Sequence, residues 1–169
     1  MGAGKSSVGR CLQSRTGLAR FDVDEIISTK FHLSTPQFFS AYGEERFRDA
    51  ETEALRGLPV DRPSIIVTGG GIVFRKENVD LLKRLGTVVW LDADEEILFQ
   101  RATRKGDRPL LQTDNPRATF SELLRNRGPV YAKTADIRID TSGMTHEEVA
   151  DAILSKIDDL VLWKKWAPD

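Results

Sequence analysis

The residues best suited to chemistry stand near the start of the chain, where Gly4, Lys5 and Ser6 form a Gly-Lys-Ser sequence. In a phosphate-binding loop, a small turn leads into a helix whose backbone N–H groups and dipole attract a phosphate chain. The lysine reaches the terminal phosphates and the following hydroxyl binds Mg²⁺. The full motif also has a β-strand and a glycine six residues before the lysine, which would lie upstream of Met1. The alternative is a chance Gly-Lys-Ser at a helix start.

Two carboxylates come next, Asp22 and Asp24 in the sequence FDVDEI. We expect residues 18–24 to form a strand, on which side chains two apart share a face. One carboxylate could then hold a metal ion, while the other accepts the proton of a substrate hydroxyl. The alternative is a solvated turn with a helix-capping aspartate.

Three glycines, Gly69, Gly70 and Gly71, end an apolar run at residues 64–68. Without Cβ atoms they let a ligand approach the backbone closely, and successive N–H groups can bind an anion. Guanidinium groups bind carboxylates and phosphates through paired hydrogen bonds. The chain has 25 basic residues, however, and physical reasoning alone does not select the functional arginines among them.

Strand and helix patterns alternate along the chain, which predicts an α/β fold with a mostly parallel sheet and helices on both faces. Ligands bind such sheets beyond the carboxyl ends of the strands. The expected strands lie at 18–24, 64–71, 87–93 and 136–140, and the expected helices at 6–15, 35–58, 78–86, 94–103, 119–131 (ending before Pro129) and 145–166, with a loop at 104–117.

Length and composition indicate one domain, residues 1–169, with a formal net charge of −1. This charge gives no electrostatic reason to expect nucleic acid or an anionic membrane as a partner. The single cysteine excludes an intrachain disulfide and fits a reducing compartment. We expect a cytoplasmic monomer, with organellar targeting left open. For Trp163 and Trp166 we expect either packing of a terminal helix or a frayed tail.

These stretches together resemble the shikimate kinase family, and the resemblance covers nearly the whole chain. Its parts are MGAGKSSVGR, FDVDEI, GEERFRDAE, VTGGGIV, VVWLDA, RPLL and RGPVYAKTADIRIDT, in this order. The resemblance implies a P-loop kinase with a parallel sheet in the order 2-3-1-4-5 and a mobile lid, here at about 104–117. It also implies transfer of the γ-phosphoryl group of MgATP to the 3-hydroxyl of shikimate, in chorismate and aromatic amino-acid biosynthesis.

The resemblance also implies roles for individual residues. Lys5, Asp24 and Arg108 match catalytic positions, and Arg108 is the lid arginine. Ser6 and Asp22 match the positions beside Mg²⁺. Shikimate-binding positions match Asp24, Arg48, Gly69, Gly70, Gly71 and Arg127, and ATP-binding positions match Gly2, Ala3, Gly4, Lys5, Ser6, Ser7, Arg101 and Arg108.

In this family's order, a strand upstream of Met1 would lie between the strands at 64–68 and 87–92. Without it, a gap of about 9.6 Å, two strand spacings, separates them. We therefore expect the functional start to lie upstream of Met1. Two alternatives stay open, a truncated shikimate-binding remnant without catalysis and a related kinase for another small polyol acid such as gluconate.

Overall fold

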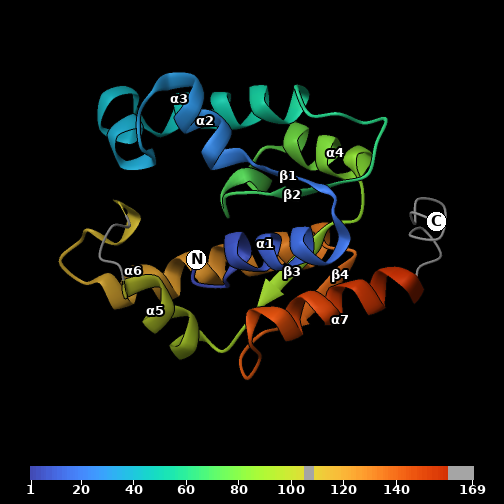
Figure 1. Ribbon diagram of the computed structural model, residues 1–169. Helices are drawn as coiled ribbons and strands as arrows, with labels where there is room; N and C mark the ends of the chain where they lie inside the picture. Colours follow the sequence, from blue (N-terminus) through green and yellow to red (C-terminus); the bar gives the residue numbers. More distant parts are fainter. Residues whose placement is uncertain (105–108, 160–169) are drawn as a thin grey trace.

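A computed structural model describes residues 1–104 and 109–159. Its strands form two separate parallel pairs (Figure 1). β1 (Ala19–Asp22) pairs with β2 (Ser64–Val67), and β3 (Val89–Asp92) pairs with β4 (Ile137–Asp140). Among the described residues, β2 and β3 are not paired with each other. The predicted gap in the sheet therefore lies between them.

Seven helices surround the strands in the described part of the chain (Figure 1). Helices α2, α3 and α4 lie with β1 and β2 in the upper half of the view, whereas α5, α6 and α7 lie with β3 and β4 in the lower half. Helix α1 contacts both halves, because it packs on β1, β2 and α7. The helices are α1 (Lys5–Thr16), α2 (Val23–Phe31), α3 (Thr35–Arg56), α4 (Lys76–Leu85), α5 (Glu95–Thr103), α6 (Pro116–Thr134) and α7 (His146–Asp159), with 3₁₀ turns at Ile72–Phe74 and Pro109–Leu111.

The local sequence accounts for most helix ends. Gly17 ends α1 in a left-handed conformation, with φ of 70°, which glycine adopts at little cost. Ser34 and Gln37 form a capping box at the start of α3, and Pro36 lies in its first turn. Thr145 and Glu148 form the equivalent pair of hydrogen bonds before α7. These starts and stops agree with the sequence expectations.

Several expectations about local structure were wrong. The strand expected at 18–24 ends at Asp22, which caps the unpredicted helix α2 by accepting a hydrogen bond from the Asp24 amide. Helix α6 does not end before Pro129 but continues to Thr134. Proline removes one helical hydrogen bond, and burial of Arg127 and Thr134 on either side of Pro129 keeps α6 packed against the fold.

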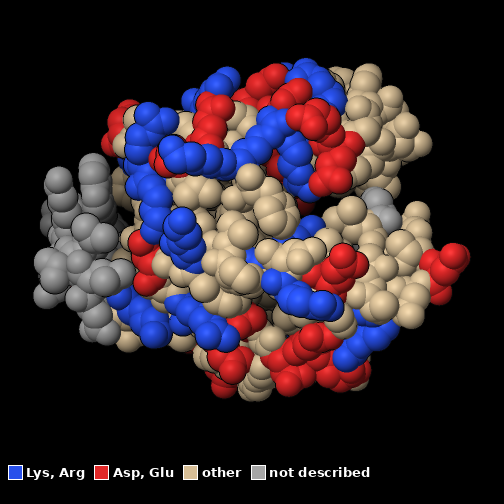
Figure 2. Space-filling model, turned by 180° about the vertical axis from the view of Figure 1, so that it is seen from behind, with Lys and Arg blue, Asp and Glu red and all other residues tan. Residues whose placement is uncertain are grey.

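The loop expected at 104–117 is shorter in the structure, because Asn115 caps α6 and Pro116 begins it. Arg108, the arginine expected on the lid, lies outside the described residues. No described helix is long and apolar enough to cross a bilayer. On the face seen in Figure 2, acidic and basic side chains lie interspersed, in keeping with the net charge of −1.

The hydrophobic core is divided in a way that follows the split sheet. Ile66 packs in a cluster built mainly by α2, α3 and α4 around Phe38 and Phe47. Val89 and Leu91 of β3 pack in other clusters, with α5 and α7. Strands inside a parallel sheet are usually buried on both faces, but every residue of β3 is only half-buried. The reason is a cavity between β2 and β3.

Candidate active site

A cavity of about 480 Å³ lies where β1 and β2 end and α1 begins. Most residues that the sequence singled out line it, although they come from segments far apart in the chain. Ala3 lines the neighbouring cavity between β2 and β3 instead. The predicted residues around the first cavity, which we call the site cavity, are Gly2, Gly4, Lys5, Ser6, Ser7, Asp22, Asp24, Arg48, Gly69, Gly70, Gly71, Arg101 and Arg127.

The Gly-Lys-Ser sequence forms the amino end of α1, and its backbone requires glycine. Gly4 is the residue before the helix, with φ of 76°, and Gly2 has φ of 77°. A side chain on Gly2 would also collide with the Leu98 carbonyl oxygen. Lys5, Ser6 and Ser7 make up the first turn of α1, whose amide groups have no carbonyl partner within the helix. This end of the cavity is therefore suited to bind an anion.

Asp22 connects the phosphate-loop region to the second aspartate. The Ser6 hydroxyl donates a hydrogen bond of 3.0 Å to Asp22 Oδ2, and the Asp24 amide donates one of 3.2 Å to Asp22 Oδ1. Asp22 is only 5% exposed. The two aspartates reach the same cavity, but not as strand neighbours. Asp22 ends β1 and Asp24 lies in the first turn of α2. Asp22 caps a helix, as the alternative expected, but it is buried rather than solvated, and its role beside a metal ion stays a prediction.

Arg48 lies flat against the glycine segment. A Cβ atom on Gly71 would be 2.5 Å from Cζ and both terminal nitrogens of Arg48, so only glycine leaves room for the guanidinium group. Arg48 Nη1 donates to Glu51 at 2.8 Å, and Nη2 donates to Glu44 at 2.6 Å. Two carboxylates from the same helix thus hold the guanidinium group at the cavity wall.

Arg127 approaches the same glycine segment from α6. A Cβ atom on Gly70 would be 3.3 Å from Arg127 Nη1 and 2.7 Å from the Tyr131 hydroxyl. That hydroxyl donates a hydrogen bond of 2.6 Å to the Gly70 carbonyl, and burial raises the pKa of Tyr131. Arg127 is 4% exposed, its Nε has no hydrogen-bond partner, and it forms no ion pair within residues 1–104 and 109–159. A buried cation without a counter-charge is costly unless a ligand supplies one.

Glu51 was not selected from the sequence, yet it is the most buried carboxylate at the site. It is 0% exposed, and its Oε1 has no hydrogen-bond partner in the described structure. A Cβ atom on Gly69 would be 3.0 Å from this oxygen and 3.4 Å from Asp24 Oδ1. Burial raises the pKa of Glu51 and Asp24 adds to the shift, although Arg48 opposes it. The sequence signal that could have identified Glu51 is its position three residues after Arg48, because residues three apart on a helix are neighbours.

Two residues on the other side of Gly4 complete the cavity. A Cβ atom on Gly4 would be 3.0 Å from His146 Nε2, which places the first residue of α7 beside the phosphate loop. No role for His146 followed from the sequence. Arg101 of α5 donates hydrogen bonds of 3.2 Å to the side chain and to the carbonyl oxygen of Thr141. Both residues line the site cavity.

Comparisons with known proteins agree on one family. The family model described as shikimate kinase matches residues 1–158. A shikimate kinase from Thermodesulfovibrio yellowstonii is 42% identical over 160 residues, which cover 95% of this chain and 92% of that protein. One from Rhodopseudomonas palustris is 36% identical, covering 94% and 78% of the two chains.

Solved structures give the same result for the fold. A shikimate kinase from Acinetobacter baumannii in complex with shikimate matches with a TM-score of 0.89 and 37% identity, over 96% of this chain and 90% of that one. The shikimate kinase of Aquifex aeolicus matches with a TM-score of 0.79 and 33% identity, over 96% and 94% of the two chains. The described strand pairs thus belong to the fold of these enzymes.

Proposed function

The chain belongs to the shikimate kinase family, and we propose that its site cavity transfers the γ-phosphoryl group of ATP to the 3-hydroxyl of shikimate. The products are 3-phosphoshikimate and ADP. The observation that carries this proposal is the buried guanidinium group of Arg127, which forms no ion pair among the described residues and lies beside a glycine segment that also receives Arg48. Two guanidinium groups against one glycine segment are suited to bind the carboxylate of a small acid.

Arg48 and Arg127 would fix the substrate by its carboxylate, while the glycines Gly69, Gly70 and Gly71 let its ring approach the backbone. Asp24, close to Gly69, would accept hydrogen bonds from the ring hydroxyl groups. As the 3-hydroxyl oxygen attacks the γ-phosphorus, the bond from that phosphorus to the bridging oxygen of ADP breaks. The hydroxyl proton moves to the Asp24 carboxylate, which acts as the general base.

The loop Gly2–Ser7 and Arg101 would hold ATP at the other end of the cavity. Lys5 would contact the terminal phosphates and stabilise the charge that spreads over them in the transition state. Arg108 would add a second cation from the lid segment. Positioning of the two substrates and these fixed cations supplies most of the catalysis expected for phosphoryl transfer.

The residues present fit a magnesium ion bound with ATP. Mg²⁺ prefers oxygen ligands and retains several waters, so it needs few protein groups. The Ser6 hydroxyl and the Asp22 carboxylate, 3.0 Å apart, supply two oxygens beside the phosphate loop. Ser6 would contact the ion directly, with Asp22 in contact with the ion or with one of its waters. When bound, Mg²⁺ neutralises phosphate charge.

A coupled assay for ADP release, with shikimate and gluconate compared as acceptors, tests the proposal. Shikimate-dependent turnover in the presence of MgATP is the expected result. Turnover with gluconate but not with shikimate would show that the protein is a kinase for gluconate instead. Saturable shikimate binding by calorimetry without any turnover in a folded protein would support the non-catalytic remnant instead.

A further inference from the structure

A buried chain of hydrogen bonds connects α3, which carries Arg48, to the turn that follows the glycine segment. Asn78 of α4 lies at its centre and is 0% exposed. Its Nδ2 group donates a hydrogen bond of 3.1 Å to the Ile72 carbonyl oxygen. The Thr52 hydroxyl of α3 lies 2.8 Å from Asn78 Oδ1 and 3.0 Å from the Arg48 carbonyl oxygen, so its proton can be donated to either. The chain thus runs from the residue after Gly71 to the backbone of Arg48.

These hydrogen bonds join the same two segments that meet at the site cavity. The Arg48 guanidinium group lies against Gly71, where a Cβ atom would be 2.5 Å from it. Arg48 and Gly71 line the cavity, whereas Thr52 is 5% exposed and Asn78 lies wholly in the interior. The two segments are therefore in contact twice, through a polar link inside the protein and through a guanidinium group at the cavity wall.

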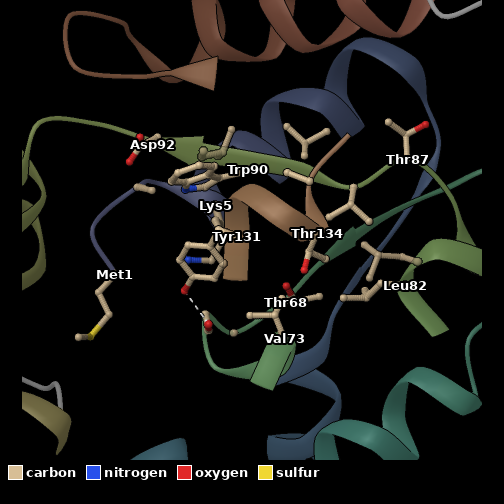
Figure 3. Close-up of a pocket in the computed structure, with 18 of the residues that line it drawn as sticks. Met1, Lys5, Thr68, Val73, Leu82, Thr87, Trp90, Asp92, Tyr131 and Thr134 are labelled. Carbon is tan, nitrogen blue, oxygen red and sulfur yellow. Dashed lines mark hydrogen bonds between the residues drawn. The ribbon is translucent and has the colours of Figure 1, made fainter. Parts of the chain in front are cut away.

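The glycine segment is also held from α6. The Tyr131 hydroxyl donates a hydrogen bond to the Gly70 carbonyl oxygen, drawn as a dashed line in Figure 3. Gly70 is thus fixed from α6 and Ile72 is fixed from α4. Where the Arg48 guanidinium group lies over this segment then depends on how α3 is attached to it.

An outer connection between the same segments is made by Arg75. It donates hydrogen bonds of 2.7 Å to Asp49 and 3.1 Å to Glu45. The side chain of Glu45 is 93% exposed and that of Asp49 is 45% exposed. Ion pairs as exposed as these contribute little, because water and salt screen them. A buried amide, by contrast, is costly unless its groups are hydrogen bonded, so the interior link through Asn78 favours one placement of α3.

We propose that Asn78 and Thr52 are positioning residues for the substrate carboxylate. They fix α3 relative to the glycine segment, and thereby fix the Arg48 guanidinium group against Gly71. Apolar side chains in their places could fill the same volume, but hydrophobic contacts are non-directional, whereas hydrogen bonds set both distance and angle. Because it assigns the carboxylate of shikimate to Arg48 and Arg127, this role rests on the proposed function.

Two substitutions of Thr52 test the proposal with little change in shape. Thr52→Val replaces the hydroxyl with a methyl group, whereas Thr52→Ser keeps the hydroxyl. Thr16→Val is the matched control, because the Thr16 hydroxyl donates a hydrogen bond of 2.8 Å to the Leu12 carbonyl at the far end of α1. Asn78→Leu removes the centre of the link. Calorimetry gives the Kd for shikimate, and the coupled assay gives kcat and the KM for each substrate.

Thr52→Val should raise the Kd and the KM for shikimate by roughly tenfold, because a slightly displaced guanidinium group loses its hydrogen-bond geometry. The KM for ATP should stay within about twofold, since the phosphate loop on α1 is untouched. Asn78→Leu should give the same split between the two substrates. Thr52→Ser and Thr16→Val should bind shikimate within about threefold of the parent value. General destabilisation would instead lower the melting temperature without separating the two KM values.

A double-mutant cycle shows whether the effect passes through Arg48. In the Arg48→Met background, Thr52→Val should change kcat/KM for shikimate by less than about twofold, because no guanidinium group remains to be displaced. An undiminished effect in that background would overturn the proposal. So would an unchanged Kd in Thr52→Val, or an equal rise in the KM for both substrates. A parent protein that does not bind shikimate would refute the proposed function and this role with it, which distinguishes that failure from the others.

Discussion

Replacing Gly71 with alanine should weaken shikimate binding through one defined collision. Gly71 has φ of −89° and ψ of −8°, a conformation that alanine adopts without strain. The new Cβ atom would lie 2.5 Å from three atoms of the Arg48 guanidinium group. Ordinary contact between such atoms begins at about 3.4 Å, so the two groups must separate by roughly 1 Å. The new Cβ atom is bonded directly to the backbone, so the Arg48 guanidinium group is the one that must move.

The size of the effect follows from the hydrogen bonds that Arg48 would lose. A hydrogen bond between charged groups contributes about 1.5–3 kcal/mol, and each 1.4 kcal/mol corresponds to tenfold in affinity. Loss of one such bond to the shikimate carboxylate predicts a Kd raised about 10- to 100-fold. Isothermal titration calorimetry with shikimate measures this directly and does not require turnover.

Gly128→Ala is the matched control for this experiment. Gly128 lies next to Arg127 on α6, and a Cβ atom there would have no neighbour within 4 Å. Its Kd for shikimate should stay within twofold of the parent value. If Gly71→Ala binds shikimate as tightly as Gly128→Ala does, Arg48 does not hold the carboxylate from its position against Gly71.

Three further substitutions test other parts of the site. Arg127→Leu should weaken shikimate binding at least about 100-fold. It should not lower the melting temperature of the ligand-free protein, because it removes a buried charge that has no ion-pair partner within the described part of the chain. A Kd within tenfold of the parent value would contradict the binding role of Arg127. Asp24→Asn should lower kcat by about 10²- to 10⁴-fold with less than a tenfold change in shikimate Kd, and an unchanged kcat would exclude it as the base. Burial raises the pKa of Glu51 above its ordinary 4.5, so the folded state binds that proton more tightly than the unfolded state does. Stability contributed by the protonated form is therefore lost as pH rises above 4.5. Glu51→Gln, which cannot ionise, should gain in melting temperature relative to the parent as the pH is raised from 4.5. A pH-independent difference between the two proteins would contradict a raised pKa of Glu51.

Much of the site could be predicted because its residues occur in short, ordered motifs. The phosphate-loop residues, the two aspartates and the glycines each follow a strand or begin a helix, and all of these except Ala3 line the site cavity. The gap between β2 and β3 also followed from the family sheet order. The functional roles of these residues remain predictions that the proposed substitutions address.

The features missed were those that depend on packing between distant segments. Glu51 is noteworthy only because both Arg48 and Gly69 lie against it, and the contact with Gly69 joins segments that are far apart in the chain. His146 reaches Gly4 only when α7 packs beside α1. Helix α6 passes through Pro129 although local preference favours an end there, since tertiary burial on both sides outweighs one lost hydrogen bond.

The central claim is that this cavity moves a phosphoryl group from ATP to a ring hydroxyl of shikimate. Phosphorus NMR of the protein with MgATP and shikimate tests it most directly. We predict a new phosphate monoester resonance, coupled to the proton on C3 of shikimate, that grows as ATP is converted to ADP in equal amount. Conversion of ATP to ADP and inorganic phosphate alone, or an unchanged spectrum from folded protein, would contradict it.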